Sequence, residues 1–386
     1  MTIEPSRNGK REKRPRRWAP RMWLGCGLGP WVRLLARNRF AVGWQYSYIA
    51  AIDTIGAAVN AGLYGFQQLR FGRQVNATEL VAPPVFIIGH WRSGTTLLHE
   101  LLVRDPEHTV PNTYECFSPN HFLVSEDFVR RWFSWVMPEK RPMDNMVTGW
   151  ERPQEDEFAL CNMGQPSPYL DIAFPNRNGS VARYLDPDQF TPAERESWKA
   201  ALIWFLKCVT LRTPKRIVLK SPPHTSRVKL LAEAFPEACF VNIVRNPYEL
   251  FASTVNLWRV FYAAHGLQKP KCEGLEEYVF NTFTLMHEKL EQARRTVDPA
   301  QIYDLRYEDL VADPMGEVRA IYEHFGWDFE RVRPGVEEYM ASVSDYRRNR
   351  YDLAHHEKAA VARRWAAYFH RYGYPIKDDA PASLVQ

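Results

Sequence analysis

The chain has 386 residues, of which 45% are hydrophobic, and its formal net charge is +5. This length and apolar content allow a large buried core and fit one large α/β domain with an N-terminal extension. The six cysteines are scattered, without a CxxC pair or a cluster of histidines. That pattern argues against a zinc site and a disulfide framework and favours a reducing cytoplasm.

The first 23 residues are expected to form a basic, disordered leader. They carry +6 and leave the rest of the chain at about −1, because Glu4 and Glu12 are outnumbered by eight cations: Arg7, Lys10, Arg11, Lys13, Arg14, Arg16, Arg17 and Arg21. Such a stretch either solubilises the chain or contacts acidic lipid or nucleic acid. It lacks the apolar core of a secretory signal. Because the rest of the chain is nearly neutral, we expect no nucleic-acid partner.

Residues 41–69 form an apolar segment with a single charge, Asp53. The segment is long enough to span a bilayer, but an aspartate near the bilayer centre is costly. We therefore expect residues 24–80 to form a helical extension that packs on the domain or lies on a membrane surface, in preference to a transmembrane helix. The expected location is the cytoplasm, and peripheral contact of residues 1–69 with the inner membrane face stays open.

Beyond residue 80, short apolar runs alternate with helical patterns. The runs are 84–89, 216–219, 239–244 and 302–305. This alternation predicts an α/β fold with a mostly parallel central sheet flanked by helices on both faces. The main domain is expected at 81–376, followed by a tail at 377–386. Within it, residues 115–214 have an irregular pattern and are predicted to be an insertion that forms the acceptor side.

A phosphate-binding loop is predicted at Gly89-His90-Trp91-Arg92-Ser93-Gly94-Thr95-Thr96, between the first strand and its helix. A loop in this position directs backbone N–H groups and the positive end of a helix at an anion. The spacing of the two glycines matches a nucleotide-binding P-loop, but Thr95 stands where that loop has its lysine. Arg92 supplies a cation instead. The pattern favours a ligand with one 5′-phosphate and an adjoining anion.

The segment GHWRSGTTLL resembles the 5′-phosphosulfate loop of sulfotransferases that use 3′-phosphoadenosine-5′-phosphosulfate (PAPS). It is most similar to the RSGTT branch, which includes the tyrosylprotein sulfotransferases and many bacterial members. The resemblance covers roughly residues 83–374. It implies a P-loop NTPase-like three-layer fold, transfer of a sulfuryl group from PAPS with release of the bisphosphate PAP, and donor contacts from the loop: Arg92, Ser93, Gly94, Thr95 and Thr96.

A second anion site is predicted at the end of the run 239–244. Arg245 follows this run and Ser253 comes eight residues later. Asn246 as N-cap, Pro247 at the first helical position and Glu249 as the partner in a capping box predict a helix directly after Arg245. In the family, an arginine and a serine so placed hold the 3′-phosphate of the donor.

Two further matches to the family are looser. Tyr307, in the segment Arg306–Leu310, corresponds to a tyrosine that lies against the adenine, although a helix-entry motif has the same pattern. Arg348, in the basic segment Tyr346–Tyr351, corresponds to a loop that lends cations to the 3′-phosphate. A surface charge run explains that segment equally well.

Catalysis of sulfuryl transfer can rely on positioned cations without a bridging metal. Arg245 stands where a P-loop NTPase often ends a strand with a magnesium-binding aspartate, so we expect no metal. Arg92 and Lys220, which follows the run 216–219, are predicted to shield the charge that grows on the leaving phosphate. Lys220 lies in the segment Leu-Lys-Ser-Pro, which resembles a lysine segment of the tyrosylprotein branch.

The base that takes the proton of the acceptor has three candidates. Glu115 lies after the first helix, where the tyrosylprotein branch has its catalytic glutamate. His224 has a side chain suited to proton transfer near neutral pH. The acidic run Glu155–Glu157 lies in the insertion. The residues alone leave these alternatives open.

Two other readings of the whole chain are a nucleotide-dependent kinase and a membrane-associated scaffold with a degenerate nucleotide fold. The missing P-loop lysine and the missing acidic metal ligand argue against the kinase. The joint presence of Arg92, Lys220, Arg245 and Ser253 argues against the scaffold. The acceptor is an unidentified hydroxyl or amine, on a glycan, lipid, peptide or phenol.

Overall fold

The computed structural model describes residues 21–133, 149–177, 182–342 and 353–376. Its centre is a five-stranded sheet in the order β2-β3-β1-β4-β5, in which every pair of neighbours is parallel. The strands are β1 (Val85–Ile88), β2 (His108–Thr109), β3 (Arg216–Lys220), β4 (Cys239–Val244) and β5 (Ile302–Arg306). The predicted parallel α/β sheet is confirmed.

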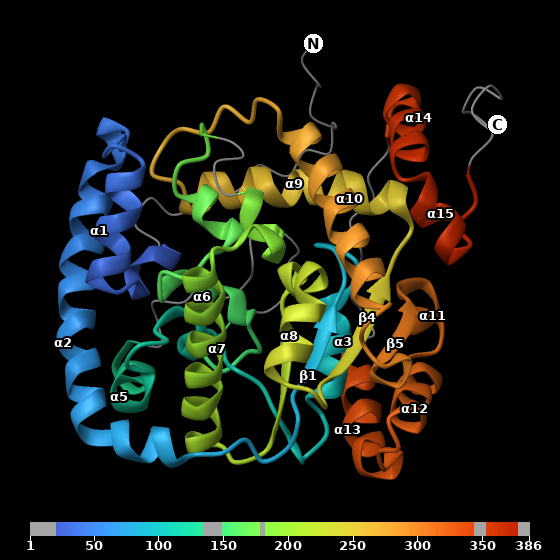
Figure 1. Ribbon diagram of the computed structural model, residues 1–386, viewed down its shortest axis with the longest axis horizontal. Helices are drawn as coiled ribbons and strands as arrows, with labels where there is room; N and C mark the ends of the chain where they lie inside the picture. The colour runs from blue at the N-terminus through green and yellow to red at the C-terminus, as the bar shows by residue number, and fades with distance from the viewer. Residues whose placement is uncertain (1–20, 134–148, 178–181, 343–352, 377–386) are drawn as a thin grey trace.

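Helices cover both faces of this sheet (Figure 1). Alternate residues of a strand point to opposite faces, so Val85 and Ile87 of β1 enter one core and Phe86 and Ile88 the other. The first core is closed by α3 (Thr95–Leu102), α11 (Tyr307–Ala312), α12 (Pro314–His324) and α13 (Phe329–Ser342). The second is closed by α7 (Pro192–Arg212), α8 (Val228–Ala234), α9 (Pro247–His265) and α10 (Leu275–Ala293).

The predicted insertion, whose sequence pattern is irregular, is largely helical in its described residues. It contains α4 (Thr113–Phe117), α5 (Phe122–Phe133), α6 (Asp156–Asn162) and the long helix α7. Thr191 and Glu194 form a capping box at the start of α7. Apolar residues at helical spacing follow that box and are buried: Trp198, Ala201, Leu202, Phe205, Leu206 and Val209. This local signal was sufficient to predict the helix.

The N-terminal extension is a helical hairpin along one edge of the molecule (Figure 1). It consists of the short 3₁₀ helices η1 (Met22–Gly25) and η2 (Trp44–Tyr46) and the helices α1 (Leu28–Arg37) and α2 (Ser47–Ala77). Trp23 of η1 is fully buried and donates its Nε1–H to the carbonyl of His265 at 2.7 Å. The boundary drawn at residue 23 for the leader therefore falls inside the packed hairpin, and residues 1–20 lie outside the described part of the chain.

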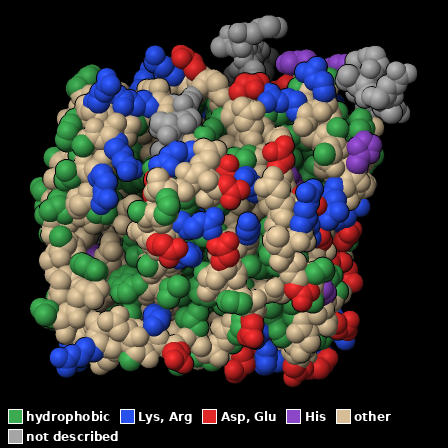
Figure 2. Space-filling model, in the orientation of Figure 1, with side chains coloured by type: hydrophobic (Ala, Val, Ile, Leu, Met, Phe, Trp, Pro, Cys, Tyr) green, Lys and Arg blue, Asp and Glu red, His purple; other side chains and the backbone are tan. Residues whose placement is uncertain are grey.

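Among the described residues, one helical stretch, Trp44–Ala77, is long and apolar enough to cross a membrane by length and composition. Ile49, Ala57 and Val75 of this stretch are buried, but most of its large apolar side chains face solvent, and Figure 2 shows hydrophobic side chains along the edge of the molecule that α2 forms.

Candidate functional site

The loop between β1 and α3 has the backbone of an anion-binding turn. Gly89, Arg92 and Gly94 adopt positive φ angles of +141°, +71° and +107°. Only glycine enters this region without strain, so Arg92 is held there by its surroundings. A Cβ atom on Gly94 would lie 2.3 Å from the ring of Tyr307. The second glycine is therefore required both for the turn and for this close approach.

Two threonines that the sequence reasoning missed brace the loop from behind. The Gly89 N–H donates to Oγ1 of Thr225 at 2.8 Å, and Oγ1 of Thr254 donates to the carbonyl of Trp91 at 3.1 Å. Each threonine directly follows a predicted site residue, His224 or Ser253, and this proximity was the available signal.

The loop and the second anion site meet. Arg92 donates its Nε–H to Oγ of Ser253 at 2.9 Å, and Nη1 of Arg245 donates to the carbonyl of Arg92 at 3.1 Å. Arg245 follows β4, which is the neighbour of β1, while Ser253 lies on α9. The structure thus brings together two motifs that are more than 150 residues apart in the sequence.

Tyr307 completes this group. The guanidinium carbon of Arg245 lies 4.4 Å from the centroid of the Tyr307 ring, whose other neighbour is Gly94. Two buried polar atoms here have no hydrogen-bond partner, Oγ of Ser93 and Nε of Arg245. Buried donors of this kind normally find a partner, so both fit a site that receives an anionic ligand. Thr95 and Thr96 begin α3, as predicted.

Glu249 departs from its predicted role. Asn246 is the N-cap of α9 and Pro247 its first residue, as expected, but the Glu249 carboxylate does not close a capping box. It accepts a hydrogen bond from Nη2 of Arg245 at 2.6 Å. A second neighbour of Arg245 is Tyr368 of α15 (Ala366–Tyr372), whose hydroxyl accepts from the Arg245 N–H at 3.0 Å.

Lys220 lies at the carboxyl end of β3, beside β1, and is almost fully buried. Its Nζ donates to Oε1 of Glu155 at 2.8 Å. The other oxygen of that carboxylate accepts from the hydroxyl of Tyr169, which accepts in turn from Nε1 of Trp91 at 3.0 Å. This chain of hydrogen bonds connects Lys220 and Glu155 to the phosphate loop. Burial, and next the neighbouring Glu155, raises the pKa of Tyr169 well above its usual value.

The other two acidic residues of the run are buried in ion pairs. Nε2 of His224 lies 2.6 Å from Oδ2 of Asp156, and Arg227 pairs with Glu157. Burial opposes ionisation of Asp156, but His224 and Ser221 hold its pKa below the ordinary value. Both side chains of the His224–Asp156 pair are fully buried, and the role of His224 as the base stays a prediction. These pairs fasten the start of α6 to the segment after β3.

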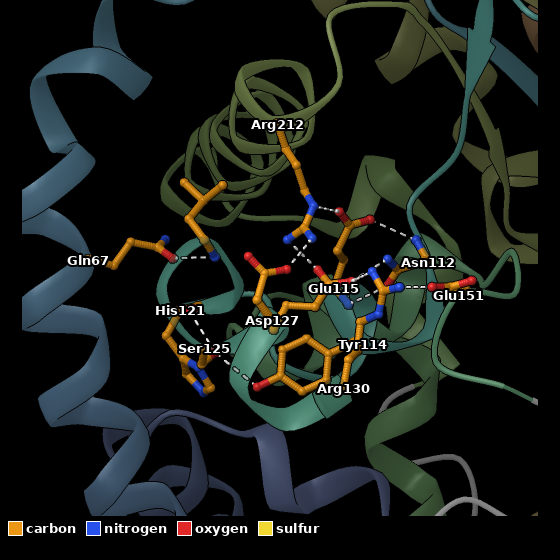
Figure 3. A network of polar contacts seen from close by, with 12 residues as sticks. Gln67, Asn112, Tyr114, Glu115, His121, Ser125, Asp127, Arg130, Glu151 and Arg212 are labelled. Atoms are coloured by element: carbon orange, nitrogen blue, oxygen red, sulfur yellow. Dashed lines mark hydrogen bonds and ion pairs between the residues drawn. The ribbon is translucent and has the colours of Figure 1, made fainter. Parts of the chain in front are cut away.

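Glu115 forms a capping box with Asn112 at the start of α4. Its carboxylate accepts from the Asn112 N–H at 2.8 Å, while Oδ1 of Asn112 accepts from the Glu115 N–H. Figure 3 shows it in a polar network with Arg212, Arg130 and Asp127, from α7 and α5. Burial raises the pKa of Glu115 to about 7, against the effect of the Asn112 N–H. Its contacts with Asn112 and Arg212 lie outside the phosphate loop and do not involve Lys220.

Arg348 lies outside the described residues, so its predicted role stays a prediction. The part of the chain that the structure describes contains no group of three or more His, Cys, Asp or Glu side chains that could hold a metal ion.

Comparisons with known proteins agree with this geometry. The profile described as Sulfotransferase family matches residues 83–331. The omega-hydroxy-beta-dihydromenaquinone-9 sulfotransferase Stf3 of Mycobacterium bovis is 45% identical over 98% of this chain and 97% of that protein, and its Mycobacterium tuberculosis counterpart matches equally.

Two solved structures share the fold. Sulfotransferase STF9 from Mycobacterium avium superimposes with a TM-score of 0.63 at 19% identity, covering 85% of this chain and 87% of that one. Sulfotransferase STF1 from Mycobacterium tuberculosis gives a TM-score of 0.59 at 21% identity, with 88% and 91% covered.

Proposed function

This chain belongs to the sulfotransferase family and transfers a sulfuryl group, and from that premise we propose that its donor is PAPS and its acceptor the hydroxyl group of an isoprenoid-quinone lipid. The observation that carries the donor assignment is the junction of Arg92, Ser253 and Arg245. It holds two cations and the start of α3 beside one another, as a nucleotide with separate 5′ and 3′ anionic groups requires.

The residues of the junction divide the work of holding such a donor. Arg92, Ser93 and the first N–H groups of α3 would hold the 5′-phosphosulfate. Arg245 and Ser253 would hold the 3′-phosphate, and Tyr307 would support the base. The unpartnered Oγ of Ser93 and Nε of Arg245 support this assignment, because a phosphate oxygen would satisfy each of them.

The acceptor assignment rests on the 45% identical relative, whose name specifies a hydroxylated dihydromenaquinone. The interior beside the loop is consistent with an apolar acceptor, because it is aromatic. Trp91 packs against Tyr169 and Trp258, and Phe158 and Phe261 extend the cluster.

We assign to Glu155 the role of the base that takes the acceptor's proton. We assign to Arg92 and Lys220 the neutralisation of the charge on the leaving phosphate. Glu155 retains some exposure, whereas Asp156 and Glu157 are sealed in ion pairs. In the transfer, the acceptor oxygen forms a bond to sulfur while the bond from sulfur to the 5′-phosphate oxygen breaks. The carboxylate of Glu155 takes the hydroxyl proton, and the cations neutralise the departing phosphate.

The acceptor is tested by incubating the purified protein with sulfur-labelled PAPS and one of three hydroxyl compounds. These are an omega-hydroxylated dihydromenaquinone, a tyrosine peptide and a simple phenol. We expect label in the quinone alone. Transfer to the peptide or phenol at a similar or higher rate would refute the lipid assignment and leave the donor assignment standing.

The base is tested with Glu155→Gln and, as a matched control, Glu115→Gln. The first change should lower kcat by about 100-fold or more, since a general base contributes that much, while binding of the product bisphosphate stays unchanged. Glu115→Gln should leave kcat within a few-fold of the wild type. The opposite ranking of the two variants would assign the proton to Glu115.

A further inference from the structure

Helix α2 turns three of its polar residues toward the protein. Asp53, Asn60 and Gln67 recur every seven residues and are all buried. Nδ2 of Asn60 donates to the carbonyls of Leu24 at 2.7 Å and Cys26 at 3.0 Å. Oε1 of Gln67 accepts from the Leu123 N–H at 2.9 Å, a contact drawn in Figure 3. The polar stripe therefore fastens α2 to η1 and α5.

The opposite stripe of α2 and η2 is apolar and exposed. Its residues follow each other at helical intervals, so that they share one face, and two of them, Trp44 and Leu69, are 87% and 89% exposed. We call this surface the α2 outer face, and it consists of Trp44, Tyr48, Ile52, Ile55, Val59, Phe66 and Leu69. A helix on a water-exposed surface has the reverse arrangement, so this face is built to be covered.

The exposed charges of residues 21–78 are all positive. Residues 21–78 contain six arginines and one acidic residue, Asp53, which is buried. Arg33, Arg37 and Arg39 lie before α2, and Arg70 and Arg73 lie in its last turns; all five are exposed. Figure 2 shows hydrophobic side chains along this edge, with Lys and Arg toward its two ends.

We propose that the α2 outer face docks the protein in the plane of an anionic lipid bilayer. Apolar side chains with Trp and Tyr among them suit the acyl and headgroup boundary, and the arginines suit anionic headgroups. Helix α2 lies along the surface and does not span it. Spanning would separate Asn60 and Gln67 from their protein partners and move them, with the buried Asp53, into hydrocarbon, where unpaired polar groups are costly.

A second copy of the chain fits this face less well than lipid does. In a dimer built on α2, the arginines at the two ends of each helix would approach those of the partner helix, and the described residues 21–78 offer no exposed carboxylate to pair with them. Like charges brought together in this way oppose association. An anionic bilayer removes the conflict because every arginine meets the opposite sign.

Docking in this orientation brings the insertion near the lipid. The carbonyl of Phe117 at the end of α4 touches Gly25 of η1, and Asn162 of α6 donates to the carbonyl of Met22 at 3.1 Å. Helix α6 begins directly after Glu155. The hairpin therefore connects the membrane surface to the helix that follows the assigned base. The docking itself does not rest on the acceptor assignment.

The test is sedimentation of the full-length protein with vesicles of phosphatidylcholine containing about one third phosphatidylglycerol, and with pure phosphatidylcholine. Wild type should bind the anionic vesicles and be released in part at about 1 M salt, where the screening length is short. Ile55→Glu should lower the vesicle partition coefficient by at least about tenfold, since it places a charge in the face that the bilayer would bury. Arg70→Glu with Arg73→Glu should weaken binding to the anionic vesicles only.

Ile376→Glu is the matched control, because it makes the same change at an exposed residue just after α15, on the side of the molecule away from α2 (Figure 1). It should bind as the wild type does. The proposal would be overturned if the wild type failed to bind the vesicles, or if Ile55→Glu and Ile376→Glu lost vesicle binding equally. It would also be overturned if only deletion of residues 1–20 abolished vesicle binding. A wild-type dimer that Ile55→Glu converts to a monomer would overturn it as well. Unchanged binding of the product bisphosphate in each variant separates these outcomes from failure of the donor site.

Discussion

Arg92 contributes both to the backbone shape of the loop and to its positive charge. Its φ of +71° costs on the order of 1–3 kcal/mol for a residue with a side chain. The contacts of its Nε with Ser253 and of its carbonyl with Arg245 hold it in place. The strained backbone thereby directs a guanidinium toward the place where the loop receives its anion.

Arg92→Ala and Lys220→Ala should each slow sulfuryl transfer by about 100-fold or more, because each removes a cation that neutralises the leaving phosphate. The measurement is kcat at saturating donor and acceptor, with circular dichroism to verify the fold. Near-normal turnover in either variant would refute the role of that residue.

Glu249 occupies one nitrogen of Arg245, so under the proposed donor assignment it would compete with the incoming 3′-phosphate. The carboxylate is more than half exposed, so the pair itself is worth no more than about 1 kcal/mol. Glu249→Gln should therefore tighten binding of the product bisphosphate by up to about fivefold, as measured by calorimetry. Weaker binding in the variant would show that Glu249 supports the orientation of Arg245 instead of competing for it.

At the scale of elements, two contacts position the helical parts around the sheet. Asp156 and Glu157 fasten the start of α6 to the segment after β3, and the polar stripe fastens α2 to α5 and η1. Polar groups used in this way are costly when one partner is lost. The acceptor side therefore depends on buried polar pairs as well as on apolar packing.

The buried carboxyl group of Asp53 should make the stability of the α2 packing depend on pH. Burial raises the pKa of its carboxyl group to about 7, and Arg21 offsets this only in part. Between the ordinary value near 3.8 and about 7, the folded state holds a proton that the unfolded chain releases, so this group lowers the free energy of unfolding as pH rises through that window.

Asp53→Asn removes this titration. The free energy of unfolding of the variant minus that of the wild type, from urea denaturation, should increase between pH 4 and pH 7 by up to roughly 4 kcal/mol and level off above it. Parallel pH profiles for the two proteins would contradict the proposed burial of the charge.

At the scale of the whole molecule, the donor site connects the phosphate loop, β4, α9 and α15. Binding of the bisphosphate product should stabilise the entire fold by roughly 2.7 kcal/mol at a concentration one hundred times Kd. Thermal unfolding should show this shift in the wild type and its loss in Arg245→Ala. ATP with magnesium should have no comparable effect; stabilisation by ATP would favour the kinase reading.

Local chemistry made the phosphate loop and the start of α9 predictable. Gly89, Arg92 and Gly94 lie within a few residues of each other, so their spacing alone implies a turn. The adjacent pair Asn246-Pro247 likewise implies a helix start. The same holds for β1 and β4, whose apolar runs are buried on both faces and read directly as parallel sheet.

The sequence by itself thus determined the parallel sheet and the loop, because these depend on short-range patterns, and its resemblance to the sulfotransferases implied that Arg245 and Ser253 join the loop in one site. Only the tertiary structure decided which acidic residue lies beside Lys220 and which face of α2 points outward. The run Glu155–Glu157 presents three equivalent carboxylates in sequence, and ion pairs with residues more than 60 positions away distinguish them. Likewise, Asp53, Asn60 and Gln67 read as interruptions of an apolar segment until their burial, and the partners of Asn60 and Gln67 on η1 and α5, show them to be its inner face.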